Sequence, residues 1–169
     1  GMRGRKGSEY DGGHRVPFIV SWPIGKVKKG EKSNQLIGLQ DLYSTFSEIL
    51  KVPLPDLRKG SKGGEDSFNI LPTWKGEKIS NRPMFYNDHK ESKDGAACAM
   101  RLDNPKVDGK TIKGQWKIFF DATLLRKAKA NPIELYNLAT DPMEANNRLE
   151  DPELKPLIKK LISTAIQHR

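Results

Sequence analysis

Lys6 lies in a glycine-framed stretch near the start of the chain, and its setting is the one that best suits anion chemistry. Gly4 and Gly7 flank it closely, and Gly12 and Gly13 follow a few residues later. Because glycine lets backbone N–H groups approach a ligand, such a loop can bring amides and an ammonium group to one anion. A compact point charge suits a tetrahedral sulfate or phosphate oxygen. The stretch therefore predicts an anion-binding loop, although Gly-x-Lys-Gly alone is also typical of a disordered basic terminus.

The other reactive side chains are scattered along the sequence. Cys98 is the only cysteine, so no disulfide can form within the chain. The alanines around it are typical of a buried strand rather than of an electropositive cleft that activates a thiolate. His14, His89 and His168 are far apart, and only Asp88, next to His89, places a carboxylate beside an imidazole. Neighbouring residues on a strand point to opposite faces, so even this pair favours a loop histidine over a catalytic one.

The length of the chain limits the number of domains, and its net charge limits the classes of partner. The chain has 169 residues, enough for one compact domain with a small attached lobe. Lys and Arg number 30 against 21 Asp and Glu, and the net charge of +9 favours anionic partners: nucleic acid, anionic lipid, or sulfated and phosphorylated substrates. The positive charges are dispersed and not interleaved with aromatic residues, which disfavours nucleic acid. No apolar stretch approaches the roughly 18 residues of a membrane span, and no apolar signal region is present, so no membrane partner is expected.

One strand, one helix and a linker are predicted in the first part of the chain. The run HRVPFIVSW over residues 14–22 lies between turn-forming residues, and its near-continuous apolar character is typical of a strand buried on both faces. Apolar residues then recur at spacings of three and four as far as Leu50, with Asp41 as a first-turn acid, which predicts a helix over residues 41–50. Residues 53–69 hold prolines and glycines among charged residues, which indicates a linker.

The second part is predicted to be a small antiparallel sheet closed by a helix. Short strand-like segments, each followed by a turn-rich or charged stretch, indicate antiparallel pairing. These segments span residues 82–87, 97–102, 115–120 and 133–137. An apolar stripe follows, with Asp151 as the expected N-cap and Pro152 after it, and predicts a C-terminal helix over residues 154–167. The predicted fold class is therefore α+β.

Taken in order, these segments resemble the sulfatase family, the arylsulfatase-like enzymes of the alkaline phosphatase superfamily. The stretch GRKGSEYDGGHRVPFIVSWP matches the family pattern G-x-K-G-x-x-x-E-G-G-x-R-V-P-x-x-x-x-W-P, with Asp11 where the family usually has Glu. SFNILPTWKGE, QWKIFF and ELYNLATDPMEANN resemble later family segments in the same order, so the resemblance covers almost the whole chain. It implies that residues 1–75 are the C-terminal end of the catalytic α/β domain and that residues 76–169 are the small C-terminal subdomain.

The resemblance also implies roles for individual residues. Lys6 matches the family lysine that contacts the sulfate group of the substrate. His14 follows that loop and is a further candidate for the substrate pocket, whereas Arg15 is expected to be structural and paired with a carboxylate. Asp88 and His89 are candidate substrate contacts, because the small subdomain borders the substrate cleft in full-length relatives.

The nucleophile and the metal of the family are not expected in this chain. Sulfatases hydrolyse sulfate esters with a formylglycine made from the Cys or Ser of a C/S-x-P/A-S/C-R motif, held beside a calcium ion. The sequence around Cys98 lacks that motif, and the metal motif that precedes the lysine loop is missing too. The resemblance therefore implies a C-terminal fragment that is inactive alone, from a periplasmic or extracellular parent acting on sulfated carbohydrates or aryl sulfates.

Two other function classes remain open from the sequence. The basic surface would suit a non-catalytic module that binds anionic polysaccharide, and the charge alone would suit nucleic acid. The predicted strand over residues 14–22 bears on association as well. Without neighbouring strands it would present apolar surface and unpaired backbone, which favours self-association or pairing with an N-terminal half of the enzyme.

Overall fold

The computed structural model describes residues 1–87 and 97–168, which form two compact units. The first, here called the sheet unit, contains Gly1–Pro17 together with the chain from Asn81 onward. The second, here called the helical unit, contains Phe18–Ser80. The N-terminal segment that carries Lys6 therefore belongs to the same unit as the predicted antiparallel sheet. The assignment of these parts to sulfatase domains stays a prediction.

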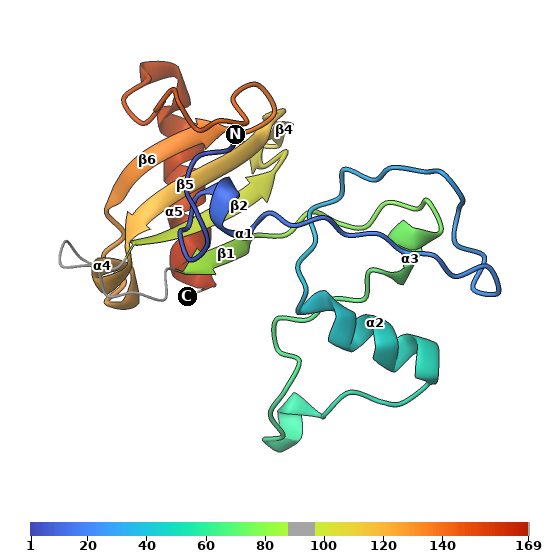
Figure 1. Ribbon diagram of the computed structural model, residues 1–169. Helices are drawn as coiled ribbons and strands as arrows, with labels where there is room; N and C mark the ends of the chain where they lie inside the picture. Colours follow the sequence, from blue (N-terminus) through green and yellow to red (C-terminus); the bar gives the residue numbers. More distant parts are fainter. Residues whose placement is uncertain (88–96, 169) are drawn as a thin grey trace. The chain divides into compact units, whose positions relative to one another are not determined.

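Four antiparallel strands in the order β1-β2-β5-β6 form the sheet unit (Figure 1). The strands are β1 (Met84–Asn87), β2 (Ala97–Asp103), β5 (Gln115–Asp121) and β6 (Pro132–Asn137). They confirm the four strands predicted from the sequence. The connections hold three short elements that were not predicted: the hairpin of β3 (Lys106–Val107) and β4 (Lys110–Thr111), and the helix α4 (Ala122–Arg126).

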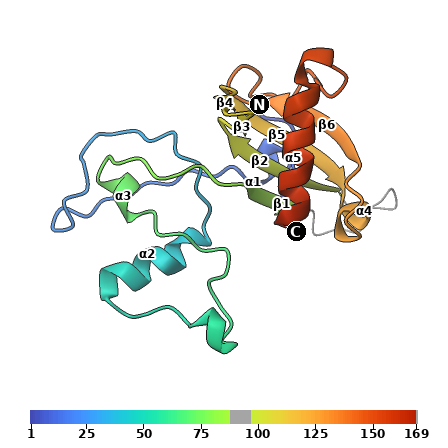
Figure 2. The ribbon, with the colours of Figure 1, turned by 180° about the vertical axis from the view of Figure 1, so that it is seen from behind.

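β5 lies between β2 and β6 and is buried on both faces. On one face Trp116, Ile118 and Phe120 join the larger hydrophobic core. On the other face Phe119 packs with aromatic residues of a smaller core, and Lys117 is fully buried. A strand of this kind needs cover on both sides. Figures 1 and 2 show that the C-terminal helix covers one face and the N-terminal segment covers the other.

The covering helix is α5 (Lys155–Gln167), which follows the 3₁₀ turn η2 (Pro152–Leu154). Three of its apolar side chains are buried in the larger core: Leu157, Leu161 and Ala165. The helix confirms the one predicted over residues 154–167. Asp151 precedes η2 but makes no side-chain cap, because its carboxylate pairs with Arg148 at 2.7 Å. The predicted capping role of Asp151 is therefore wrong.

The helical unit contains three helical elements: α2 (Asp41–Leu50), η1 (Leu57–Lys59) and α3 (Leu71–Trp74). α2 confirms the predicted helix, and η1 is the only regular element within the predicted linker over residues 53–69. Hydrogen bonds from the polar face of α2 hold the returning chain. The Asp41 carboxylate accepts from the N–H of Phe68 at 3.1 Å, and the Thr45 hydroxyl accepts from the N–H of Ile70 at 3.0 Å. None of the helices in the described part of the chain has the length and apolar composition of a membrane span.

The strand predicted over residues 14–22 is absent from the structure. The segment starts at the end of the short helix α1 (Asp11–His14) and continues without regular structure. A strand exists only where a neighbour completes its backbone hydrogen bonds, and none of the described strands pairs with this segment. Ile19, expected to be buried, is 90% exposed. The apolar pattern is present, but no partner strand covers it.

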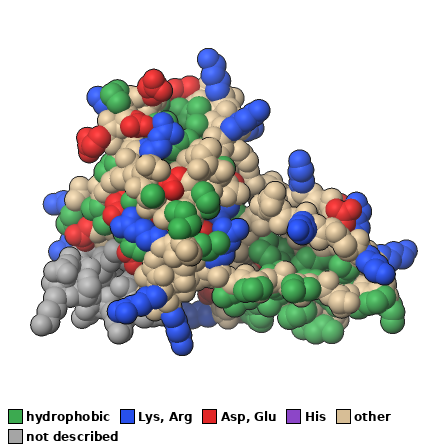
Figure 3. All heavy atoms as spheres, turned by 45° about the horizontal axis from the view of Figure 1, so that its top comes forward, with side chains coloured by type: hydrophobic (Ala, Val, Ile, Leu, Met, Phe, Trp, Pro, Cys, Tyr) green, Lys and Arg blue, Asp and Glu red, His purple; other side chains and the backbone are tan. Residues whose placement is uncertain are grey.

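Apolar side chains of α2 face solvent. Tyr43, Phe46 and Leu50 are exposed, whereas Ser44 and Thr45 on the polar side of the helix are buried. Figure 3 shows hydrophobic side chains gathered over the helical unit. Surface patches of this kind usually mark an interaction site, because apolar groups gain free energy when they leave water.

The chain alone is expected to self-associate through this apolar stripe of α2. Replacing Phe46 with aspartate places a charge in the stripe, so the average mass measured by sedimentation equilibrium should fall toward that of the monomer. Glu48→Lys changes an exposed charge on the same helix and should leave the mass unchanged. A strictly monomeric unmodified chain at high concentration would contradict the prediction.

Candidate functional site

The lysine loop runs from Arg3 to Gly12 and carries Lys6. Its neck is closed by a hydrogen bond from the N–H of Gly12 to the carbonyl of Arg3, at 2.8 Å. Inside the loop, the N–H of Ser8 donates to the carbonyl of Arg5 at 2.9 Å. Lys6 itself is exposed, and it makes no hydrogen bond or ion pair with the part of the chain that the structure describes. The loop is thus held by its backbone and leaves the lysine available.

Gly12 and Gly13 let the loop close on itself. A Cβ atom on Gly12 would lie 2.5 Å from the carbonyl oxygen of Arg3, and one on Gly13 would lie 2.2 Å from that of Ser8. Both distances are shorter than real contacts of a Cβ atom, and the atoms met belong to backbone that cannot turn aside. The glycine pair is therefore explained by close packing of the helix α1 against the lysine loop.

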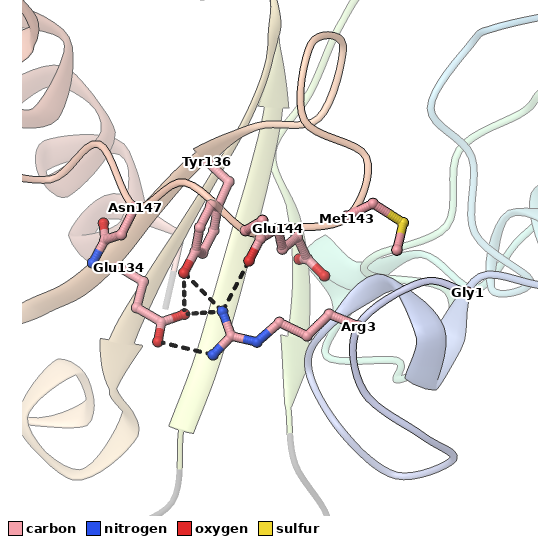
Figure 4. Close-up of a pocket in the computed structure, with 8 residues that line it drawn as sticks. Gly1, Arg3, Glu134, Tyr136, Met143, Glu144 and Asn147 are labelled. Atoms are coloured by element: carbon pink, nitrogen blue, oxygen red, sulfur yellow. Dashed lines mark hydrogen bonds and ion pairs between the residues drawn. The ribbon is translucent and has the colours of Figure 1, made fainter.

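Arg3 anchors the first end of the lysine loop (Figure 4). Its guanidinium donates to the Tyr136 hydroxyl at 2.8 Å and to the carbonyl of Glu144 at 3.0 Å, and it pairs with the Glu134 carboxylate at 3.4 Å. The same guanidinium lies 3.9 Å from the centre of the Tyr10 ring, a favourable cation–π contact. Burial and the hydrogen bond to Glu134 raise the pKa of Tyr10, so its hydroxyl remains a donor.

Three buried charges, here called the buried charge cluster, hold the second end. Asp11, Lys117 and Glu144 have relative exposures of 2%, 0% and 0%. The Lys117 ammonium lies 2.9 Å from Asp11 Oδ1 and 2.9 Å from Glu144 Oε1. The backbone N–H of Asp11 also donates to Glu144 Oε2 at 2.9 Å. The carboxylates compensate the buried ammonium, which would otherwise be costly to remove from water.

Sequence reasoning did not identify the buried charge cluster. Its members are far apart along the chain, and only folding brings them together. One signal was available: Lys117 interrupts the apolar run Trp116 to Phe120 in the central strand. Lysine is almost never fully buried unless it is paired, so this position called for a carboxylate partner. The sequence did not show which carboxylates would supply it.

His14 and Arg15 both approach Asp11. His14 Nε2 lies 3.5 Å from Asp11 Oδ1, and the imidazole stacks on Tyr86 with ring centres 3.9 Å apart. Arg15 lies 3.7 Å from Asp11 Oδ2, which confirms its predicted carboxylate partner, but its side chain is 54% exposed. Burial would raise the pKa of Asp11, but the hydrogen bond from His14 and the positive charge of Lys117 outweigh it and lower the pKa. The proposed contact of His14 with substrate stays a prediction.

Acid is expected to weaken the anchoring of the lysine loop. Because the pKa of Asp11 is lower in the folded chain than its ordinary 3.8, its ionised form stabilises the fold above about that pH. The contribution is lost as the pH falls further and Asp11 becomes protonated. Urea unfolding of the unmodified chain and of Asp11→Asn should therefore give free energies that converge below pH 3.8. A difference that stays constant from neutral to acid pH would contradict this expectation.

A surface pocket of about 570 Å³ lies next to Arg3. Figure 4 shows Glu134, Tyr136, Met143 and Asn147 around it. The Arg3 guanidinium at this pocket already binds Tyr136, Glu134 and the backbone of Glu144. These contacts belong to the anchor of the lysine loop, so the pocket is a part of that anchor.

The other residues considered for the site are Asp88, His89 and Cys98. Asp88 and His89 lie outside the described residues. Cys98 is 3% exposed and packs in the larger core, so it does not fit a formylglycine. Within the described ranges, no three His, Cys, Asp or Glu side chains are grouped so as to hold a metal ion. The space between Asp11 and Glu144 is filled by the Lys117 ammonium, so these carboxylates do not fit calcium.

Several known sulfatases are similar in sequence to this chain. It is 30% identical over 171 residues to an N-acetylgalactosamine-6-O-sulfatase of Bacteroides thetaiotaomicron, a match that covers 96% of this chain and 29% of that protein. It is 28% identical over 166 residues to an ulvan-active sulfatase of Formosa agariphila, covering 90% of this chain and 32% of that protein. The chain thus spans less than a third of the length of either relative.

The chain was also compared with protein-family models and with solved structures. No protein-family model matches the chain. The solved structure of a 2-O GAG sulfatase superposes on 76% of this chain and 23% of its own, with a TM-score of 0.48 and 17% identity. The sequence relatives carry the conclusion: the chain is homologous to sulfatases, and its partial coverage of them is consistent with their C-terminal portion.

Proposed function

We propose that this chain supplies the C-terminal part of a carbohydrate sulfatase and that Lys6 contacts the sulfate group of the substrate. One relative is named for N-acetylgalactosamine 6-O-sulfate and another for activity on ulvan, which favours a sulfated carbohydrate as the substrate class. The observation that carries the proposal is the lysine loop, which is fixed at both ends and leaves the Lys6 ammonium exposed.

The chemical task of Lys6 would be electrostatic. Hydrolysis of a sulfate ester breaks a sulfur–oxygen bond and shifts negative charge among the oxygens around sulfur. A cation already held against a non-bridging oxygen stabilises that charge without having to reorganise during the reaction. An exposed lysine on a loop closed by backbone hydrogen bonds suits this task, because the ammonium can reach the oxygen while the loop limits its range.

The nucleophile and the calcium site would come from another part of the enzyme. Cys98 and the buried carboxylates do not fit these roles, and the chain matches less than a third of each relative. We therefore expect the 169-residue chain alone not to hydrolyse sulfate esters. The exposed apolar stripe of α2 is the kind of surface that would pack against a larger domain.

The test is a hybrid sulfatase in which this chain replaces the segment of the Bacteroides enzyme that aligns with it. The hybrid should hydrolyse 6-sulfated N-acetylgalactosamine, and the chain alone should not. The same hybrid with Lys6→Ala separates the sulfate contact from a merely structural contribution. Turnover by the purified chain alone, or turnover by the hybrid that does not depend on Lys6, would refute the proposal.

A further inference from the structure

Glu144 contacts both ends of the lysine loop. Its backbone carbonyl accepts a hydrogen bond from Arg3 at 3.0 Å, and its carboxylate accepts one from the N–H of Asp11 at 2.9 Å. Arg3 opens the loop, and Asp11 stands next to Gly12, which closes it. One residue therefore spans the neck of the loop that carries Lys6.

The backbone of Glu144 is held in an unusual conformation to make these contacts. Its φ angle is +53°, in the left-handed region that non-glycine residues seldom adopt. The turn that imposes this angle is braced by Asp141, whose carboxylate accepts from the N–H groups of Ala145 and Asn146 at 3.0 and 2.8 Å. Strained residues that the surrounding structure keeps in place are concentrated at functional sites.

Lys117 completes the arrangement from the central strand. Its ammonium bridges the carboxylates of Asp11 and Glu144, so the loop is tied to β5 as well as to the turn after β6. Well-packed apolar residues often serve stability as well as a buried ion cluster does, so stability alone does not account for these charges. Buried charges differ from apolar groups in one respect: any arrangement that leaves them unpaired costs free energy, so they favour a single geometry.

We propose that Glu144, together with Lys117, is a positioning residue that fixes where Lys6 stands relative to a bound sulfate ester. This inference rests on the proposed function of Lys6. In this role neither residue contacts the substrate. Both act by tying the lysine loop, and with it the Lys6 ammonium, to the sheet. A loop released at its neck would still carry the ammonium, but it would hold the ammonium less often at the distance that the reaction needs.

Amide hydrogen exchange of the full chain, followed residue by residue by NMR, tests the structural part. Glu144→Ala should speed exchange at the Gly12 N–H by at least about tenfold relative to the amides of β2, because local opening is measured separately from global unfolding. Glu144→Gln keeps an acceptor for the N–H of Asp11 and should restore most of the protection. Asp103→Ala is the matched control: Asp103 is a buried carboxylate that pairs with Arg101 at 2.8 Å. Because Asp103 lies in β2, its loss should speed exchange in that strand without selectively releasing Gly12.

Kinetics of the hybrid sulfatase test the functional part. Glu144→Ala should lower kcat about tenfold or more with a smaller change in KM, and Glu144→Gln should recover most of kcat. If Glu144→Ala does not fold, Asp11→Ala, which removes the other carboxylate bound to Lys117, should show the same pattern.

Two results for Glu144→Ala would overturn the inference. One is equal acceleration of amide exchange at Gly12 and in β2; the other is selectively faster exchange at Gly12 with an unchanged kcat. An unmodified hybrid without turnover that depends on Lys6 would instead refute the proposed function. In that case exchange at Gly12 still decides whether Glu144 fixes the loop.

Discussion

Replacing Lys117 with methionine is expected to lower the free energy of unfolding of the sheet unit by about 3–5 kcal/mol, the cost of breaking a buried ion pair from one side. Methionine fills a similar volume but leaves Asp11 and Glu144 buried without the ammonium between them. Two carboxylates that lose their shared cation in a water-poor interior repel each other. Urea unfolding at neutral pH, followed by far-ultraviolet circular dichroism, measures the loss.

Two further variants test whether the lost free energy of unfolding comes from the uncompensated carboxylates. Lys113→Met removes a lysine that is exposed near the start of β5 and should change the free energy of unfolding by no more than about 0.5 kcal/mol. Adding Asp11→Asn and Glu144→Gln to Lys117→Met removes the uncompensated charges and should recover much of the stability. If Lys117→Met costs no more than Lys113→Met, the buried charge cluster does not anchor the lysine loop.

Replacing Lys6 with alanine in the hybrid sulfatase is expected to lower kcat/KM about 10²-fold, the usual loss when one preorganised electrostatic contact to the transition state is removed. Stability should hardly change, because Lys6 is exposed and has no partner among the described residues. Lys6→Arg retains the charge but replaces a compact ammonium with a planar group, so an intermediate rate is expected. Steady-state kinetics with a sulfated sugar give the comparison.

Arg5→Ala is the matched control for that experiment. Arg5 is an exposed cation of the same loop, one residue from Lys6, so its removal lowers the local positive potential by the same charge. A specific contact predicts a large effect of Lys6→Ala and a small effect of Arg5→Ala. Equal effects would show that the loop attracts the substrate through its general field and that Lys6 makes no particular contact.

Much of the secondary structure could be predicted from local patterns. The strands β1, β2, β5 and β6 stand out as short apolar segments between turns, and α2 and α5 as apolar residues at helical spacing. The same logic failed for residues 14–22, because an apolar run records a tendency to be buried and not the presence of a partner strand. The apolar stripe of α2 was predicted correctly as the pattern of a helix, but its side chains Tyr43, Phe46 and Leu50 face solvent in this chain. Local sequence predicts which face is apolar, but tertiary structure decides what covers it.

The candidate site was predictable only in part. Lys6 and its glycines could be recognised because a loop motif is local. The anchors could not, since Glu144 and Lys117 meet Asp11 only after the sheet has formed. The glycine pair was noticed as a feature of an anion loop, whereas in the structure Gly12 and Gly13 provide room for the backbone of the loop itself.

A crystal structure of the hybrid sulfatase with a bound sulfate ester tests the central claim most directly. The lysine loop should keep the closed neck seen here between Gly12 and Arg3, with the Lys6 ammonium within about 3 Å of a non-bridging sulfate oxygen, the distance of a charge-assisted hydrogen bond. A sulfate held entirely by other residues, with Lys6 directed into solvent, would contradict the assignment of this loop to the active site.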